Sequence, residues 1–168
     1  MVKFANSSLF VMLSGDCKLS FDSSCYSFNT EQSTWPNNRK KCMEKGGDLV
    51  SLETEEEWAF VNEQIQKLNT EEWHIGLQKE EGWQWVSGKP LTITKWQGGQ
   101  PSGDGPFVVM AKEYPPNTFG LFNDLPDYVP RGYICEKPKV GNWLHCLSIY
   151  SLTTPKECTA VQKIERSK

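Results

Sequence analysis

The feature that most constrains this chain is its set of six cysteines: Cys17, Cys25, Cys42, Cys135, Cys146 and Cys158. An even number of cysteines in a chain of 168 residues is typical of disulfide-bonded proteins from oxidising compartments. The count alone does not fix which cysteines pair. The alternative is a zinc site, but zinc needs closely spaced pairs such as C-x2-C, and no pair here is that close. Structural disulfides are therefore the favoured interpretation.

Charge and hydropathy exclude two classes of partner. The chain has 18 lysines and arginines against 21 aspartates and glutamates, so its net charge is -3 and it has no basic field to attract nucleic acid. The longest apolar runs, Leu9 to Leu13 and Phe107 to Ala111, are far shorter than the ~20 residues that cross a bilayer, so the chain is not expected to span a membrane.

The length of 168 residues predicts one folded domain with short extensions.

Residues 1–15 resemble a weak secretory signal, with Lys3 before a modest apolar stretch and small residues at Ser14 and Gly15. This segment and the cysteines together predict an extracellular or secreted protein. The glycosylation sequon at Asn6 carries little weight, because cleavage would remove it.

Two helices are expected in the first half of the chain. In the first, Ser33 or Thr34 is the cap, Pro36 fits the first turn, and the Gly46–Gly47 pair stops a helix of about ten residues. In the second, Thr54 and Glu57 have capping-box spacing, and the glutamates are expected in solvent. One apolar face of this helix consists of Trp58, Val61, Ile65 and Leu68.

The second half reads as short antiparallel strands interrupted by one long loop. The runs "EWHIGL", "GWQWVSG", "PFVVMA" and "RGYICEK" are aromatic or β-branched and are separated by Gly, Pro and Asn. Between Lys95 and Phe107 lies "KWQGGQPSGDGPF", a length of irregular chain that is usually functional or disordered.

These motifs together resemble a C-type lectin-like domain. The matching stretches, in order, are "CYSF", "GGDLVSLETEEEWAFV", "WHIGL", "GWQWVSG", "KWQGGQPS", "FND" and "GYICEKP". The resemblance covers residues 16–138, with residues 1–15 as the signal-like segment and 139–168 as a tail without trusted periodicity. It implies an α+β fold in which two helices flank small antiparallel sheets and a long loop carries the ligand site.

The resemblance also implies the cysteine pairing. Cys42 is expected to pair with Cys135, and Cys17 with Cys25, whereas Cys146 and Cys158 match no family position and are left as a candidate pair. A second family disulfide, which ties the long-loop region, is missing. Phe107 and Asp127 stand where its two cysteines belong.

In sugar-binding members of this family, loop carboxylates and amides hold a calcium ion that coordinates sugar hydroxyls. Here Ser102 replaces the third residue of the Gln-Pro-Asp motif and Phe122 replaces the tryptophan before Asn-Asp. At most two carboxylates would face the ion, so the resemblance implies a degenerate site with no required cofactor, and Ca²⁺ only as an alternative. The candidate ligand-binding and metal-ligating residues are Gln100, Ser102, Asp104, Asn123 and Asp124.

Simpler structural roles compete with these assignments. Asn123 and Asp124 are expected to hold a turn through side-chain to backbone hydrogen bonds. Trp96, beside the loop, is a sixth ligand-binding candidate for sugar stacking, whereas Trp73 and Trp83 or Trp85 are expected to fill the core. His74 and His145 are isolated and more typical of packed or solvated residues than of ligands.

The sequence therefore predicts a non-catalytic extracellular recognition module that binds a glycan or a cell-surface or extracellular protein through the long loop. One alternative is a calcium-dependent carbohydrate-binding lectin, and another is a truncated or decoy form of a larger receptor. An enzyme is disfavoured because the chain has no H-E-x-x-H, C-x-x-C, G-x-S-x-G or phosphate-loop motif.

Overall fold

A computed structural model describes residues 17–139, which form two compact units. The larger unit is Tyr26–Lys137; the smaller one contains the described residues up to Cys25 and from Pro138 onward. Several predictions fall outside the described residues: the signal-like segment 1–15, the tail beyond residue 139, His145, and the candidate pair Cys146 and Cys158.

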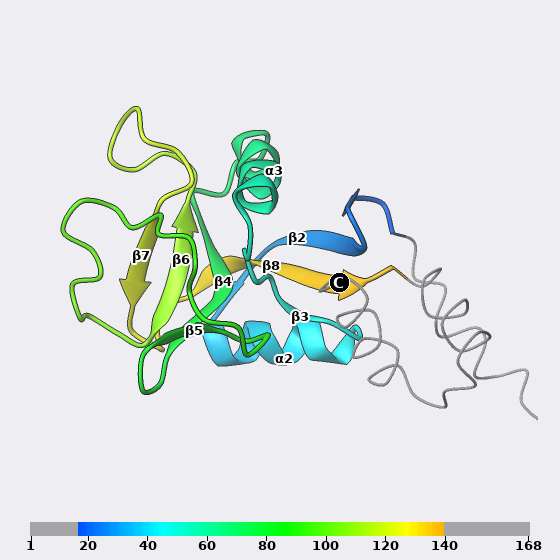
Figure 1. The fold of residues 1–168 in the computed structure, drawn as a ribbon, viewed down its shortest axis with the longest axis horizontal. Coiled ribbons are helices and arrows are strands. Elements are labelled where there is room, and N and C mark those ends of the chain that lie inside the picture. Colours follow the sequence, from blue (N-terminus) through cyan, green and yellow to red (C-terminus); the bar gives the residue numbers. More distant parts are fainter. Residues whose placement is uncertain (1–16, 140–168) are drawn as a thin grey trace, which may run out of the picture. The chain divides into compact units, whose positions relative to one another are not determined.

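Residues 17–139 contain two helices and short strands, as the α+β prediction requires (Figure 1). The helices are α2 (Trp35–Glu44) and α3 (Glu55–Gln66). The strands are β1 (Ser20–Phe21), β2 (Ser24–Ser33), β3 (Asp48–Leu49), β4 (Glu72–Lys79), β5 (Trp83–Trp85), β6 (Phe107–Ala111), β7 (Phe122–Leu125) and β8 (Arg131–Pro138). The predicted fold class is confirmed.

The strands of the larger unit follow the order β2-β8-β4-β6-β7, and β3 pairs with β8 while β5 pairs with β4. The pairings β3–β8, β4–β5, β4–β6 and β6–β7 are antiparallel. The pairing of β4 with β8 is parallel, with Trp73 opposite Gly132 and His74 opposite Tyr133. The prediction of only antiparallel strands is wrong at this pair, because the long chain between β4 and β8 allows a parallel return.

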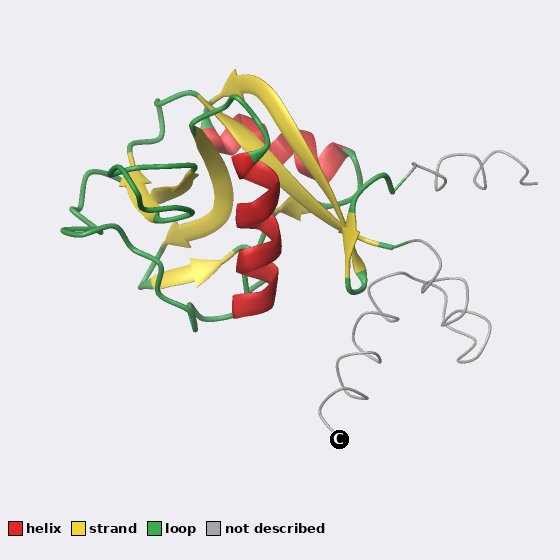
Figure 2. Ribbon diagram, turned by 90° about the horizontal axis from the view of Figure 1, so that it is seen from above, coloured by secondary structure: helices red, strands yellow, loops and turns green. Residues whose placement is uncertain are grey.

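Helix α2 begins and ends close to the predicted positions. Thr34 is the N-cap residue, although its side chain makes no capping hydrogen bond, and Pro36 lies in the first turn. Gly46 adopts φ 82°, and the Gly47 N–H donates to the carbonyl oxygen of Cys42 at 3.1 Å. Left-handed glycine here ends the helix as expected. In Figure 2 the two helices, drawn in red, run in different directions.

The start of α3 corrects one prediction. Thr54 Oγ1 accepts the Glu57 N–H at 3.1 Å, as the capping box requires. The Glu57 carboxylate, however, is buried: it accepts the Tyr26 hydroxyl at 2.6 Å and the Glu53 N–H at 3.0 Å. Burial raises the pKa of Glu57, against the lowering effect of these hydrogen bonds. Only the other glutamates of this helix start, Glu55 and Glu56, are solvated.

A core cluster surrounds the disulfide between α2 and β8. The Trp35 ring stacks on Phe107, with ring centroids 4.1 Å apart, and its indole N–H donates to the Ile75 carbonyl oxygen at 2.8 Å. Phe107 is half-buried and packs against this cluster, in a position where the resemblance implies a cysteine. The buried members of the cluster are Trp35, Cys42, Leu49, Tyr133 and Cys135.

Both cysteine pairs that the resemblance implies within the described residues are present. Cys42 is bonded to Cys135 in the larger unit, and Cys17 is bonded to Cys25 in the smaller one. The first joins positions separated by 93 residues in sequence, and the second positions separated by 8. A longer closed loop removes more entropy from the unfolded chain, so the Cys42–Cys135 bond is expected to stabilise the fold more.

Replacing Cys42 and Cys135 together by serine is expected to lower the free energy of unfolding by about 4 to 5 kcal/mol in the chain-entropy treatment. The matched control replaces Cys17 and Cys25, where the shorter loop predicts a loss of about 2 to 3 kcal/mol. Urea unfolding of both double variants measures the difference. An equal or smaller loss for the Cys42 and Cys135 variant would contradict the prediction.

His74 is fully buried in β4, as a packed histidine would be. Its Nδ1 lies 3.0 Å from the Asn38 amide nitrogen, and its Nε2 has no partner among the described residues. Burial and, to a smaller extent, the Arg131 charge lower the pKa of His74 to about 4. The imidazole is therefore neutral in the folded protein at pH 7.

This depressed pKa predicts a pH-dependent stability. Above about pH 6.5 the imidazole is neutral in both states and has no effect; as the pH falls toward 4 only the unfolded state binds the proton, so stability drops by up to about 3 kcal/mol. Thermal or urea unfolding between pH 7.5 and 4 of the parent chain and His74→Gln measures this. The variant is expected to lose the part of the pH dependence of stability that His74 causes. An unchanged pH dependence in His74→Gln would refute the lowered pKa of His74. His145 is present in both proteins and cancels in the comparison.

Candidate functional site

The long loop, residues 95–106, connects to β6 and is held against β7 where it begins. The Phe122 N–H donates to the Lys95 carbonyl oxygen at 2.6 Å, and the Gln97 N–H donates to the Phe122 carbonyl oxygen at 3.0 Å. The Trp96 ring lies 5.0 Å from Trp83 and 6.0 Å from Phe122, measured between ring centroids. In Figure 1 the green irregular chain beside β6 and β7 includes this loop.

The loop then makes tight turns where its glycines and prolines are. The Gln100 N–H donates to the Gln97 carbonyl oxygen at 2.9 Å, and the Gln100–Pro101 peptide is cis. Gly103 has φ 90°, a left-handed conformation that side chains rarely adopt. Gly105 lies so close to β7 that a Cβ there would be 2.0 Å from the Leu125 carbonyl oxygen. Glycine at these two positions lets the loop fold back onto the strand.

Asp124 is the residue that holds the middle of the loop. Its carboxylate is fully buried: Oδ1 accepts the Ser102 N–H at 2.8 Å and the Ser102 hydroxyl at 3.1 Å, and Oδ2 accepts the Gly103 N–H at 2.8 Å. Burial alone would raise the pKa of Asp124, but the hydrogen bonds from Ser102 and Gly103 outweigh it and lower the pKa below its usual value. The carboxylate therefore stays ionised and clamps the loop.

The structure brings some predicted site residues together and leaves others apart. Gln100, Ser102 and Asp124 share one hydrogen-bond network, because the Ser102 N–H also donates to Gln100 Oε1 at 2.7 Å. Asp104 is exposed and makes no hydrogen bond or ion pair with the described residues. Asn123 is half-buried, and its Oδ1 is a buried atom without a partner in residues 17–139.

The expected role of the Asn-Asp pair needs a correction. Both residues lie in strand β7, not in a turn, and each pairs with β6: Asn123 is opposite Val109 and Asp124 is opposite Val108. Alternation along the strand points them to opposite faces. Only Asp124 reaches backbone N–H groups, and these belong to the long loop rather than to its own segment.

Aromatic residues near the loop divide into core and half-exposed groups. Trp73 and Trp85 are buried, as predicted for the interior, whereas Trp83 and Trp96 are half-buried and contact each other. Trp83 was not expected at the site. Strand alternation could not have separated it from Trp85, because residues two apart point to the same face; the two differ in burial because Trp83 stands at the start of the three-residue strand β5.

The positions of the missing family disulfide are used differently. Phe107 stacks on Trp35 in the core, and Asp127 is exposed in the segment after β7. The loop is thus tied to β7 by the Asp124 hydrogen bonds and by the close approach of Gly105 to Leu125. Among residues 17–139 no group of three or more His, Cys, Asp or Glu side chains could hold a metal ion.

Removing the Asp124 carboxylate should release the loop. In Asp124→Ala the Gly103 N–H loses its charged acceptor, so we expect the free energy of unfolding to fall by about 1.5 to 3 kcal/mol and amide exchange to become faster at residues 102–105. Gly103 is the sharper reporter, because the Ser102 N–H keeps Gln100 Oε1. Hydrogen exchange measures the protection of the Gly103 amide. Asp104→Ala is the matched control, which should leave that protection unchanged. Unaltered protection of Gly103 in Asp124→Ala would rule out the clamp.

Comparison with known proteins identifies the family. The family described as Lectin C-type domain matches residues 31–137. C-type lectin domain family 4 member E of Mus musculus is 33% identical over 131 residues, which is 72% of this chain and 58% of that protein. C-type lectin domain family 4 member C of Homo sapiens is 30% identical over 126 residues, with the same shares of each chain. The chain therefore spans 58% of the length of these relatives.

Solved structures agree with these relatives. Human lithostathine superposes with a TM-score of 0.64 at 28% identity, covering 72% of this chain and 88% of that one. The C-type lectin domain of murine dendritic cell inhibitory receptor 2, solved in complex with N-glycan, gives a TM-score of 0.63 at 25% identity and covers 72% and 95%. No helix in residues 17–139 is long and apolar enough to span a membrane. On the family match, the sequence relatives and the fold together, this chain belongs to the C-type lectin family.

Proposed function

We propose that this chain is an extracellular recognition module that binds a carbohydrate or protein ligand through the long loop and β7, without requiring calcium. Membership of the C-type lectin family makes it a non-catalytic recognition domain. The observation that carries the proposal is the state of the Asp124 carboxylate, whose two oxygens already accept hydrogen bonds from the loop.

A calcium ion would have to displace these hydrogen bonds. Calcium takes about 6 to 8 oxygen ligands, and its affinity rises with the number of carboxylates. Here three oxygens, Asp124 Oδ1 and Oδ2 and Gln100 Oε1, face N–H donors, which would repel a cation. The second carboxylate, Asp104, is exposed and outside this network. The residues present therefore do not fit a strong calcium site.

The ligand surface in this proposal consists of side chains that the loop leaves partly accessible. Trp96, half-buried against Trp83, offers an aromatic face for stacking on a sugar ring or an apolar side chain. Ser102 and Asp104 are exposed and supply polar contacts. A glycan as ligand is supported by the murine dendritic cell inhibitory receptor 2 domain, which was solved in complex with N-glycan.

A calcium-dependent lectin is the second candidate, and one observation favours it. Asn123 Oδ1 is a buried acceptor without a donor in residues 17–139, next to the Asp124 carboxylate in sequence. A cation would satisfy this oxygen. To bind Asp124 as well, the ion would need that carboxylate to give up its N–H partners and Asn123 and Asp124 to turn toward one side of β7, which requires the loop and the strand to rearrange.

The extracellular placement rests on the disulfides. Structural disulfides such as Cys17–Cys25 and Cys42–Cys135 form and persist in oxidising environments and are rare in the cytosol. We place the recognition domain at residues 16–138, which contains the 31–137 family match and the N-terminal disulfide.

Calcium binding is tested by melting temperature in millimolar calcium and in chelator. A calcium concentration of 100 times the Kd would add about 2.7 kcal/mol to the free energy of unfolding, which raises the melting temperature by several degrees. We expect no rise, with magnesium at the same concentration as the control for ionic strength. A calcium-specific rise that Asp124→Ala abolishes would overturn the metal-independent site in favour of the second candidate.

The ligand class is tested with a glycan array and a library of extracellular proteins, each probed in calcium and in chelator. Binding is expected to survive chelation and to weaken in Trp96→Ala by about tenfold, the loss of one aromatic contact. Lys40→Ala, an exposed residue on α2, is the matched control. Binding that disappears in chelator, or that Trp96→Ala leaves intact, would contradict the proposal.

A further inference from the structure

The Trp96 ring, which the proposed function assigns to the ligand, packs against other rings. Its centroid is 5.0 Å from that of Trp83 at an interplanar angle of 59°, and 6.0 Å from that of Phe122 at 88°. Phe122 also makes an edge contact with the buried Trp85, with centroids 6.2 Å apart. Tilted and edge arrangements at these separations are favourable for aromatic pairs. The Trp96 ring therefore has one aromatic neighbour from β7 and another from β5.

The backbone at Trp96 is fixed independently of its ring. On one side the Lys95 carbonyl oxygen accepts the Phe122 N–H at 2.6 Å, and on the other the Gln97 N–H donates to the Phe122 carbonyl oxygen at 3.0 Å. The Lys95 ammonium also pairs with Glu55, at the start of α3, at 2.6 Å. Both β7 and α3 thus hold the start of the long loop. The freedom that remains at Trp96 is the rotation of its side chain.

The hairpin formed by β4 and β5 contacts both ends of the long loop. Trp83 on β5 is paired with Lys79 on β4. The Lys79 N–H donates to the carbonyl oxygen of Pro106, the last residue of the loop, at 2.8 Å. The Trp83 ring contacts Trp96 near the first residue of the loop. Trp83 is therefore placed by an element that is also attached to the other end of the loop.

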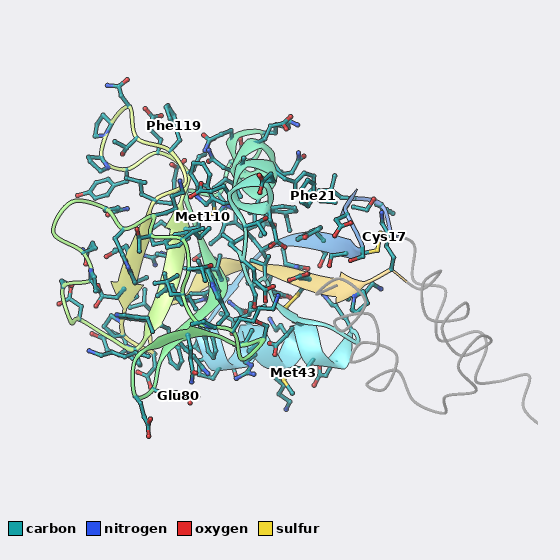
Figure 3. All side chains as sticks on the ribbon, viewed as in Figure 1. Cys17, Phe21, Met43, Glu80, Met110 and Phe119 are labelled. Carbon is teal, nitrogen blue, oxygen red and sulfur yellow. A yellow bond between two sulfur atoms is a disulfide. The ribbon has the colours of Figure 1, made fainter. Side chains whose placement is uncertain are left out.

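The turn of this hairpin is braced by side chains. Figure 3 labels Glu80 at the turn, and its carboxylate accepts Gln78 Nε2 at 2.8 Å and Gln84 Nε2 at 2.6 Å. These two glutamines are paired across the strands. The Lys79 ammonium lies 5.9 Å from the centroid of the Trp83 ring. The half-buried Trp83 thus stands on a fixed support.

We propose that Trp83 is the positioning residue for Trp96 and holds that indole in the orientation in which it meets the ligand. This role rests on the proposed function of the long loop. An indole that is already held loses less rotational freedom on binding than a free one. Of the ring contacts of Trp96 described in residues 17–139, only the one with Phe122 remains when Trp83 is removed. Part of the binding free energy would then be spent on ordering the Trp96 ring.

A direct contact between Trp83 and the ligand is the alternative. The Trp83 ring is half-buried and has both Trp96 and the Lys79 ammonium beside it, so we expect it to act through Trp96. The two roles differ in additivity. Losses at two independent contacts add, whereas a residue that acts through Trp96 has no further effect once that ring is absent.

The first test needs no ligand. NMR spectra of the ¹⁵N-labelled full chain, with its disulfides intact, are compared with those of Trp83→Ser and Trp83→Phe. In Trp83→Ser we expect the Trp96 indole N–H signal to broaden and the cross-relaxation between the Trp96 and Phe122 rings to weaken, while the Gln97 amide keeps its position. Trp83→Phe retains a ring and is expected to preserve that cross-relaxation.

Unchanged amide signals outside residues 79–97 verify that each variant is folded. Trp83→Leu, which keeps an apolar side chain but no ring, takes the place of Trp83→Ser if the serine variant does not fold. Cross-relaxation between Trp96 and Phe122 at the strength of the parent chain, in the variant without a ring, would overturn the proposal.

The second test measures the binding of a biantennary N-glycan in chelator. We expect Trp83→Ser to weaken it by about fivefold and Trp83→Phe by less than about twofold. Trp83→Ser combined with Trp96→Ala should bind no more weakly than Trp96→Ala alone. Tyr114→Ser is the matched control, because this ring is 61% exposed beyond the other end of β6 and should affect neither test.

The outcomes separate the two proposals. An additive loss in the double variant would make Trp83 a ligand contact and overturn its positioning role, as would parent affinity in Trp83→Ser. An N-glycan that does not bind the parent chain, or parent affinity in Trp96→Ala, would count against the proposed function of the loop. In that case the ring contact between Trp96 and Phe122 still decides whether Trp83 positions Trp96.

Discussion

The Cys42–Cys135 bond and the aromatic residues around it are the constraint on which the rest of the larger unit depends. The bond fixes α2 to β8, and β8 lies between β2 and β4 in the sheet. From β8 the order continues through β4 and β6 to β7 by direct strand pairing, which places Asp124 opposite Val108. The position of the proposed ligand site is thus set by a crosslink several strands away. No residue of the site has to contact the disulfide for this to hold.

At β7, the last strand in this order, hydrogen bonds to Asp124 hold the long loop, which in the family is tied by a second disulfide. A covalent bridge would restrict the loop in the unfolded chain as well as in the folded one. The hydrogen bonds from Ser102 and Gly103 to Asp124 act only in the folded protein, and they require the carboxylate to be ionised and dry. The arrangement makes the loop order depend on the same carboxylate that a calcium ion would use. In the proposed calcium-dependent alternative, metal binding would therefore compete with loop order for Asp124.

Sequence patterns predicted the elements well and the site contacts poorly, for physical reasons. Helix boundaries followed from local signals, such as Thr54 with Glu57 and the glycines after Glu44, because capping involves residues close in sequence. The resemblance also implied the Cys42–Cys135 pair. The burial of Glu57 was missed because its partner Tyr26 is 31 positions away, and the parallel pairing of β4 with β8 was missed for the same reason. The role of Gly103 depends on a buried carboxylate in another strand, which no local pattern reveals.

The β6–β7 hairpin connects the long loop, which joins β6 at Phe107, to residues 112–121 at its opposite end. Its buried residues Val108, Val109 and Met110 are fully enclosed, so the strands behave as a rigid element between these two ends. A rigid connection keeps a fixed distance but does not by itself transmit a change from one end to the other, since coupling needs an element with two arrangements. The long loop is the segment whose order depends on the ionised Asp124 carboxylate, and residues 112–120 make no hydrogen bond to that carboxylate. A ligand that reorganises the loop should therefore leave the chain at Tyr114 and Phe119 unaltered.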